Sequence, residues 1–130
     1  MGACAGGTVT SYIDGYVIAV PAANREKYEA LARTFDAMMI DHGAIRVVEA
    51  WGDDVAHGKR TDFYRATEAV EGELIIFSFA EWPDRATRDS AQAAMHEAMT
   101  QSTEPMEMPF DGARMIFGGF IPFLDLGNES

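Results

Sequence analysis

The sequence has little cysteine, little positive charge and no long apolar run. The one cysteine among its 130 residues, Cys4, cannot form an internal disulfide, which suits a reducing compartment and predicts a cytoplasmic protein. Ten basic residues oppose 21 acidic ones, for a formal charge of −11, and the basic residues are scattered along the chain. Nucleic acids and anionic membrane surfaces bind concentrated positive charge, so we expect neither as a partner. No apolar run approaches the roughly 18 residues of a membrane span.

Motifs for metals and cofactors are also missing. The three histidines, His42, His57 and His96, do not have the spacing of zinc ligands, and no cysteine accompanies them. The chain contains no P-loop, no dinucleotide fingerprint and no serine nucleophile elbow, so NTPase, dehydrogenase and hydrolase functions have no support. We therefore expect no metal and no cofactor.

The composition is that of a soluble globular protein, with 48% hydrophobic and 24% charged residues. Residues 1–10 lack the basic and apolar regions of a secretion signal. The length is that of one compact domain. We predict a flexible leader over 1–10 and a single domain over 11–130.

Strands and helices alternate in a simple order. Strand-like runs occupy 12–20, 44–51, 73–82 and 113–123. Apolar residues at helical spacing predict a helix over 24–42, with Asn24 as its N-cap and Gly43 as its end, and a second helix capped by Asp84. Residues 53–72 form a long connection that holds either a small edge strand or a turn of helix.

The order βαββαβ predicts an α+β fold, a ferredoxin-like antiparallel sheet with both helices on one face. The alternation in 73–82 places Ile76 and Trp82 on one face and Phe77 and Phe79 on the other, so both faces are apolar. Two helices cover only one face, and the other would be a large exposed apolar patch. A second copy of the sheet, packed by a two-fold axis, would cover it, and we predict a homodimer.

Five segments occur together as in a known family. They are YIDGYVIAVPAANREKY, HGAIRVVEAWGDDV, TDFYRA, EWPDRATRD and MPFDGARMIFGGF, and they span about residues 11–126. Together they resemble the YbaA-like family of small bacterial proteins, a family of unknown function. The resemblance implies a dimeric α/β barrel, the ferredoxin-like dimer also seen in small antibiotic-biosynthesis monooxygenases and haem-degrading enzymes, and it implies no established reaction. In the haem-degrading enzymes of this wider superfamily, a histidine in the second helix binds the iron beside an asparagine in the first strand and a tryptophan in the third. Here Trp82 and His96 are present, but 12–20 has no asparagine.

Four charged residues lie inside otherwise apolar strands: Asp14, Arg46, Glu49 and Arg114. A charge buried in a sheet is costly unless it is paired. Asp14 can reach Arg114 across adjacent strands, and Arg46 can meet an acid. One interpretation is structural ion pairs that define sheet register or the dimer interface. The other is a site in which Arg46 or Arg114 anchors an anion or a carbonyl and Asp14 or Glu49 is the base.

The only tryptophans, Trp51 and Trp82, both lie at strand ends, where they either line a pocket mouth or pack in the core or the dimer interface. Gly118 and Gly119 interrupt the last strand, which indicates a bulge or a close backbone approach, in our interpretation at the dimer interface. Neither pair of residues identifies a reaction by itself.

We predict a dimer that binds a small apolar or aromatic molecule between sheet and helices. A cofactor-independent monooxygenase-like or isomerase-like activity follows from the likeness of fold alone. The alternative is a non-catalytic, stress-associated binding or interaction protein. The two differ in whether the four charged strand residues face an open cavity or close on one another.

Overall fold

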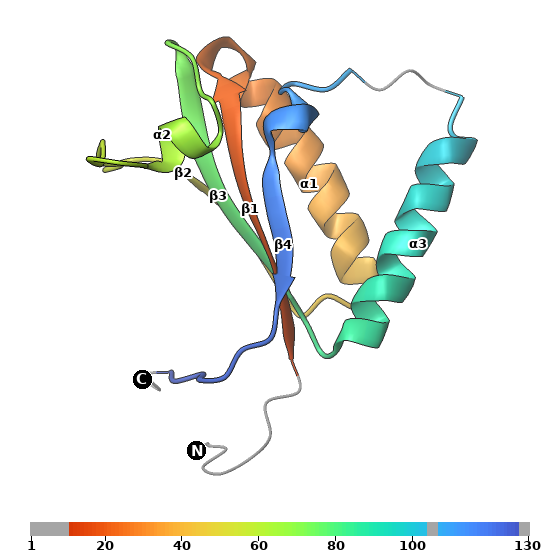
Figure 1. The fold of residues 1–130 in the computed structure, drawn as a ribbon. Helices are drawn as coiled ribbons and strands as arrows, with labels where there is room; N and C mark the ends of the chain where they lie inside the picture. Colours follow the sequence, from red (N-terminus) through yellow and green to blue (C-terminus); the bar gives the residue numbers. More distant parts are fainter. Residues whose placement is uncertain (1–10, 104–106, 128–130) are drawn as a thin grey trace.

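A computed structural model describes residues 11–103 and 107–127, and within them four strands form one sheet (Figure 1). The predicted leader, 1–10, lies outside the described residues. The strands are β1 (Tyr12–Pro21), β2 (Arg46–Trp51), β3 (Glu73–Trp82) and β4 (Ile116–Phe120). The helices are α1 (Arg25–Asp41), α2 (Phe63–Ala66) and α3 (Arg85–Gln101), with 3-10 turns at Ala22–Asn24 and Gly112–Arg114.

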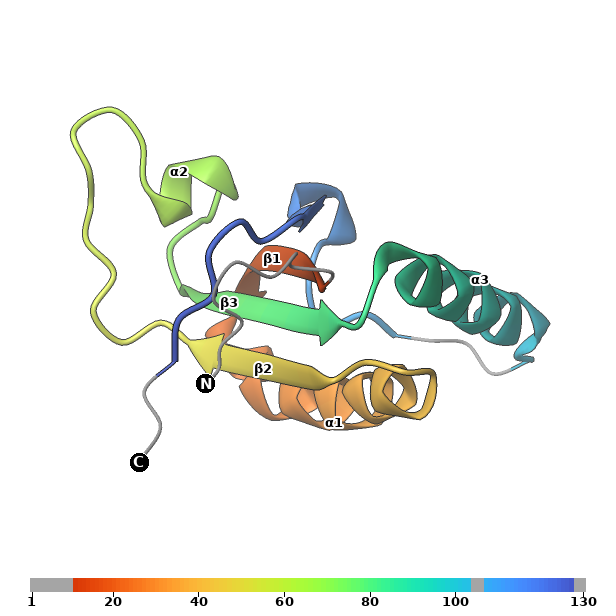
Figure 2. The same ribbon diagram turned by 90° about the horizontal axis from the view of Figure 1, so that it is seen from below.

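The sheet has the order β2-β3-β1-β4, and every neighbouring pair is antiparallel. The two long helices, α1 and α3, lie on the same side of it (Figure 1). This confirms the predicted ferredoxin-like α+β architecture. The connection between β2 and β3 loops away from the sheet before it enters α2 (Figure 2), so its one regular element is the turn of helix and not an edge strand.

The helix ends follow local chemistry with one exception. Gly43 ends α1 with a φ of 112°, a conformation that favours glycine. The Asp84 carboxylate caps α3 by accepting a hydrogen bond from the Thr87 amide at 2.7 Å. Asn24 occupies the N-cap position of α1, as predicted, but its side chain makes no capping hydrogen bond, since a 3-10 turn leads into the helix and the side-chain amide donates to the Pro109 carbonyl at 2.9 Å.

The core has two parts on the helix side of the sheet. One surrounds Trp82, which is 1% exposed, and includes Met95 of α3. The other joins Ile18 and Ile76 of the sheet to Tyr28 of α1. The candidate site described below lies beside this second part.

The opposite face of the sheet is also apolar, as the alternation predicted. Phe77 is 50% exposed, Phe120 61% and Ile116 41%, and the Phe63 ring of α2 packs edge-on against Phe77 at a centroid distance of 6.4 Å. Apolar side chains after β4 are exposed as well, among them Phe123 at 93%. Within the described chain, this face is largely uncovered.

Candidate functional site

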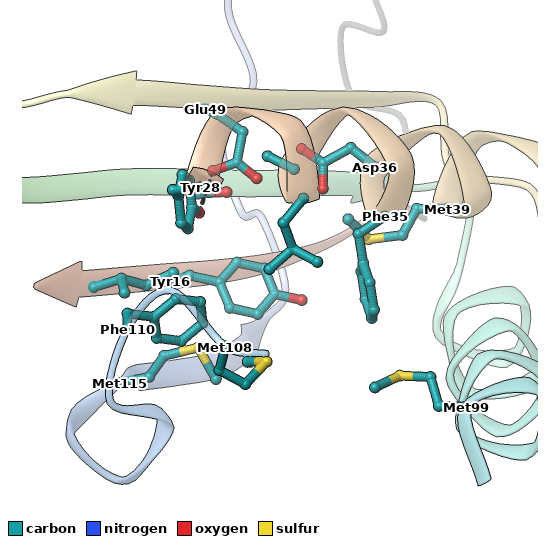
Figure 3. Close-up of a pocket in the computed structure, with 14 residues that line it drawn as sticks. Tyr16, Tyr28, Phe35, Asp36, Met39, Glu49, Met99, Met108, Phe110 and Met115 are labelled. Carbon is teal, nitrogen blue, oxygen red and sulfur yellow. Dashed lines mark hydrogen bonds between the residues drawn. The ribbon is translucent and has the colours of Figure 1, made fainter. Parts of the chain in front are cut away.

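A cavity of about 210 Å³ lies between α1 and the helix-facing side of the sheet (Figure 3). Helix α1 and the sheet supply most of its wall, and methionines border much of the rest. The lining residues are Tyr16, Ile18, Glu49 and Ser78 of the sheet; Tyr28, Leu31, Ala32, Phe35, Asp36 and Met39 of α1; Met99 of α3; and Met108, Phe110 and Met115 of the segment around the last 3-10 turn. The wall is therefore apolar except for a few side chains that converge on it.

Three of these polar side chains form one row across the sheet. Strand register pairs Tyr16 of β1 with Ser78 of β3, and Ser78 with Glu49 of β2. The neighbouring row is apolar, since Ile18 is opposite Ile76. Paired residues in adjacent strands project to the same face, so the row forms a polar strip on the floor of the cavity.

Helix α1 adds Asp36 above this strip. Tyr28, Ala32 and Asp36 are separated by four residues each, so they lie on one side of the helix, and Figure 3 shows Asp36 and Tyr28 on the side of α1 that faces Glu49. The Tyr28 hydroxyl donates to Glu49 Oε1 at 2.7 Å. Two carboxyl groups from different elements thus meet in an apolar wall.

This meeting changes the acidity of Asp36. Burial, then the hydrogen bond with Glu49 and the charge of Glu49, raise the pKa of Asp36 to about 8. At neutral pH Asp36 therefore holds a proton beside an acceptor. Burial and the neighbouring carboxyl groups also raise the pKa of Tyr16 to about 12, and burial together with the Glu49 hydrogen bond raises the pKa of Tyr28, so both phenols stay neutral hydroxyls.

Asp14, a predicted base, lies elsewhere. Its carboxylate accepts from Arg88 Nε at 3.2 Å and from Trp82 Nε1 at 3.1 Å, and the residue is 3% exposed. Burial raises the pKa of Asp14 in spite of the opposing charge of Arg88. The predicted contact with Arg114 is wrong, because antiparallel register places Gly119 opposite Asp14, several residues beyond Arg114.

Arg114, a predicted anchor, is held by a different acid. Its guanidinium donates to both carboxylate oxygens of Glu73, at 2.8 and 2.7 Å, and to Asp111 at 3.1 Å. The Arg114 hydrogen bonds lower the pKa of Glu73. A bidentate pair of this kind orients the 3-10 turn against the start of β3.

Arg46, the other predicted anchor, has an exposed side chain (63%) that lies 3.7 Å from Glu81 and over the Phe79 ring. It meets an acid as expected, at the edge of the sheet and outside the cavity wall. Of the tryptophans, Trp82 belongs to the core and bonds Asp14. Trp51 donates to Glu29 at 2.8 Å and packs edge-on against Tyr28, which lines the cavity.

Gly119 has an internal reason for its lack of a side chain. A Cβ there would collide with Tyr12 and Arg88, whose guanidinium passes over β4 to reach Asp14. The register from Ile13 to Val17 runs without interruption against Phe120 to Ile116, so there is no bulge. The close approach predicted here is confirmed, but it occurs within one chain.

Of the six predicted site residues, only Glu49 lines the cavity. Asp36 was missed although it interrupts the apolar stripe of α1, at the position after Tyr28 and Ala32 where a hydrophobic residue belongs. Among the described residues, no group of three or more histidine, cysteine, aspartate and glutamate side chains could hold a metal ion. None of the described helices is long and apolar enough to cross a membrane.

The fold and the site define a ferredoxin-like α+β protein with an acid pair in a partly open cavity. A solved structure with the same fold is that of a dimeric ferredoxin-like protein from an uncultured marine organism, with a TM-score of 0.56 and 8% identity over 89% of this chain and 98% of the other. Residues 11–112 match the model of a family described as a protein of unknown function, DUF1428. The chain is 41% identical to the uncharacterized protein YbaA of Escherichia coli K12 and equally to that of Shigella flexneri, over 88% of this chain and 97% of each relative. The chain belongs to the DUF1428 family, and the resemblance to YbaA-like proteins is confirmed.

Proposed function

We propose that the protein binds a small, largely apolar or aromatic molecule in the cavity below α1, with Asp36 and Glu49 as its polar contacts. The observation that carries this proposal is the carboxyl pair itself. Desolvating two acids side by side costs free energy, which a purely structural core would avoid with apolar residues. Pockets that combine apolar walls with a few convergent polar groups and a perturbed pKa are typical ligand sites.

The same pair supports an isomerase-like activity. Glu49 is placed to take a proton from carbon, and protonated Asp36 to give one to a carbonyl oxygen, so that a C–H bond breaks, an O–H bond forms and a ketone becomes its enol. A pKa of about 8 suits a general acid near neutral pH. Asp14 remains a proposed base only if Arg88 releases it, and Arg46 and Arg114 bind acids outside the cavity, so an anchored anionic substrate is not favoured.

Binding is tested with 4-ethylphenol, a neutral aromatic probe, by following backbone amide shifts in NMR spectra. We expect shifts at Ala32, Phe35 and Met99, and none at Phe77 on the opposite face. An unchanged spectrum at millimolar probe overturns the proposal. The reaction is tested by exchange of solvent deuterium into phenylacetone. Loss of exchange in Glu49→Gln supports catalysis, and absence of exchange in the unmodified protein supports the alternative, a non-catalytic binding protein.

We also propose that the working protein is a cytoplasmic homodimer in which a second copy covers the face that carries Phe77 and Phe120. Support comes from the exposure of these rings, at 50% and 61%, and from the structural neighbour, whose description is a dimer. Burying such a face is worth about 25 cal/mol for each Å² of apolar area.

Light scattering at micromolar concentration is expected to give twice the mass of one chain. Phe77→Glu should shift the mass toward a monomer, because it places a charge in the covered face. Ile40→Glu, an exposed apolar residue on α1, is the matched control and should leave the dimer intact. A monomeric mass for the unmodified protein contradicts the proposal.

A further inference from the structure

The charges of the cavity wall are unbalanced. Asp36 and Glu49 are acids, and no lysine, arginine or histidine is among the described residues that line the cavity. Two other buried acids of the described chain form ion pairs: Asp14 pairs with Arg88, and Glu73 pairs with Arg114. The cavity is thus a place where this chain buries acids and supplies no cation of its own.

The floor of the cavity also has unused hydrogen-bonding capacity. Ser78 lies between Tyr16 and Glu49 in the polar row and is 3% exposed, yet its hydroxyl has no hydrogen-bond partner among the described residues. The Tyr16 hydroxyl points toward the open part of the cavity in Figure 3 and likewise has none within that part of the chain. Ser78 is a buried residue and Tyr16 a half-buried one, and both line the cavity, so their hydroxyls are available to an occupant that is not part of the chain.

We propose that this occupant is a small aromatic cation, an amine or quaternary ammonium on a single ring. The inference rests on the proposed ligand-binding function and names the class of ligand. The cationic head would lie against Asp36 and Glu49, in reach of the Ser78 and Tyr16 hydroxyls. Its ring would pack between Phe35 and the tyrosine and phenylalanine side chains opposite.

The apolar wall suits such a ligand in kind and in size. Tyr28 and Phe110 meet at a centroid distance of 5.8 Å, and aromatic faces attract cations as well as rings. Met99 and Met108 add flexible thioethers that adapt to an irregular shape. A volume of about 210 Å³ is below the roughly 300–1,000 Å³ of drug-sized pockets, which limits the ligand to about one ring. The net charge of −11 raises the local concentration of cations and lowers that of anions.

Binding of a cation should be linked to a proton. Among the described residues, the titratable groups that face Asp36 are Glu49 of β2, Tyr28 of its own helix and Tyr16 of β1. In the same part of the chain, β3 presents Ser78, and α3 and the segment before β4 present methionines and Phe110. A cation beside the pair replaces the proton of Asp36 as the balancing positive charge. Below the pKa of about 8, each bound cation should therefore release about one proton, and affinity should rise about tenfold per pH unit.

The experiment compares three probes by calorimetry: benzyltrimethylammonium, neutral 4-ethylphenol and anionic phenylacetate. The quaternary probe keeps its charge at every pH, so any pH dependence comes from the protein. We expect it to bind on the order of tenfold tighter than 4-ethylphenol at about pH 8, with phenylacetate the weakest. Its dissociation constant should fall about tenfold per unit from about pH 6 to 8 and then level off. Buffers of different ionisation enthalpy should report release of about one proton below pH 8.

Variants then locate the effect. Asp36→Asn should abolish the proton release and the pH slope, and Glu49→Gln should weaken the cation but not 4-ethylphenol. Asp41→Asn, the same change at an exposed position of the same helix, should leave both as they are. Amide NMR spectra check that each variant is folded. If the cation binds no tighter than 4-ethylphenol, or without a pH slope, this inference fails while ligand binding stands; if no probe binds, both fail.

Discussion

Two groups of acids on the same side of the sheet have opposite surroundings. Asp14 accepts hydrogen bonds from Arg88 and Trp82, and Gly119 leaves the space through which the arginine reaches it. Two residues farther along β1, the row that begins at Tyr16 leads to Glu49, whose neighbours are a tyrosine hydroxyl and a second acid. The first acid is neutralised by the fold. The pair of Asp36 and Glu49 has no arginine and instead shares a proton, which Asp36 holds at neutral pH.

Glu73 belongs with Asp14 in this comparison. Arg114 donates hydrogen bonds to both carboxylate oxygens of Glu73, although the two residues are far apart in sequence. Both arginine pairs join segments that the sheet brings together, and both lie outside the cavity wall. These two ion pairs therefore join distant segments of the fold, while the cavity wall holds two partly buried acids with no basic side chain beside them.

The largest effect is expected from removing the cation at Asp14. Arg88→Met leaves a nearly buried carboxylate without its partner, and we expect a loss of about 3 kcal/mol in the free energy of unfolding. Chemical denaturation measures it. Arg85→Met, which breaks an exposed pair with Asp89, should cost about 0.5 kcal/mol or less. If the two variants are equally stable, the Asp14 pair is not structural; adding Asp14→Asn to Arg88→Met should recover part of the loss.

A smaller effect of opposite sign is expected in the cavity. The pKa of Asp36 is raised in the folded protein to about 8 from an ordinary value of 3.8, so the folded state holds the proton more tightly and stability falls as the pH rises between these values. Asp36→Asn has no proton to lose. Its melting temperature should match that of the unmodified protein in acid and exceed it, by several degrees or more, above about pH 8. An equal difference at all pH values would show that Asp36 does not titrate in this range.

The smallest expected effect is a change in the pKa of Asp36 when Glu49 is replaced. Glu49→Gln removes a charge and a charged hydrogen-bond partner from Asp36 but leaves its burial, the largest cause of the raised pKa. The pKa of Asp36 should therefore fall below about 8 and stay above its ordinary value of 3.8. Carbon-13 NMR of aspartate carboxyl groups follows the titration. An unchanged pKa would mean that burial acts alone.

Much of the fold could be predicted because its signals are local. The run over 73–82 became β3 with those bounds, Gly43 and Asp84 ended and began helices as their chemistry requires, and alternation along β3 showed two apolar faces. The last strand was predicted too long because Gly112–Arg114 forms a 3-10 turn capped by Asp111. The spacing of apolar residues does not show that a hydrogen-bonded turn will replace strand pairing there.

The site could be predicted only in part, for a reason visible in two residues. Glu49 stood out as a charge in a strand, but Asp36 lies in a helix where acids are common, and its significance depends on facing Glu49 across the cavity. Arg88 was likewise inconspicuous on α3 until the structure placed it on Asp14. Contacts between distant segments depend on strand register and on the angle of a helix over the sheet. Neither can be predicted from the spacing of apolar residues within one segment.

By itself, the sequence determined the elements, their order, the two-sided sheet and the acidic, cation-poor character of the chain, because hydrophobic periodicity, caps and charge are properties of short segments or of the whole composition. Tertiary structure alone decided that Asp14 pairs with an arginine, whereas Glu49 lies beside a second acid, Asp36. Antiparallel register placed Gly119, and not Arg114, opposite Asp14, and the packing of α1 brought Asp36 to Glu49. Electrostatic interactions depend on distance in space and on burial, so those pairings exist only once the chain is folded.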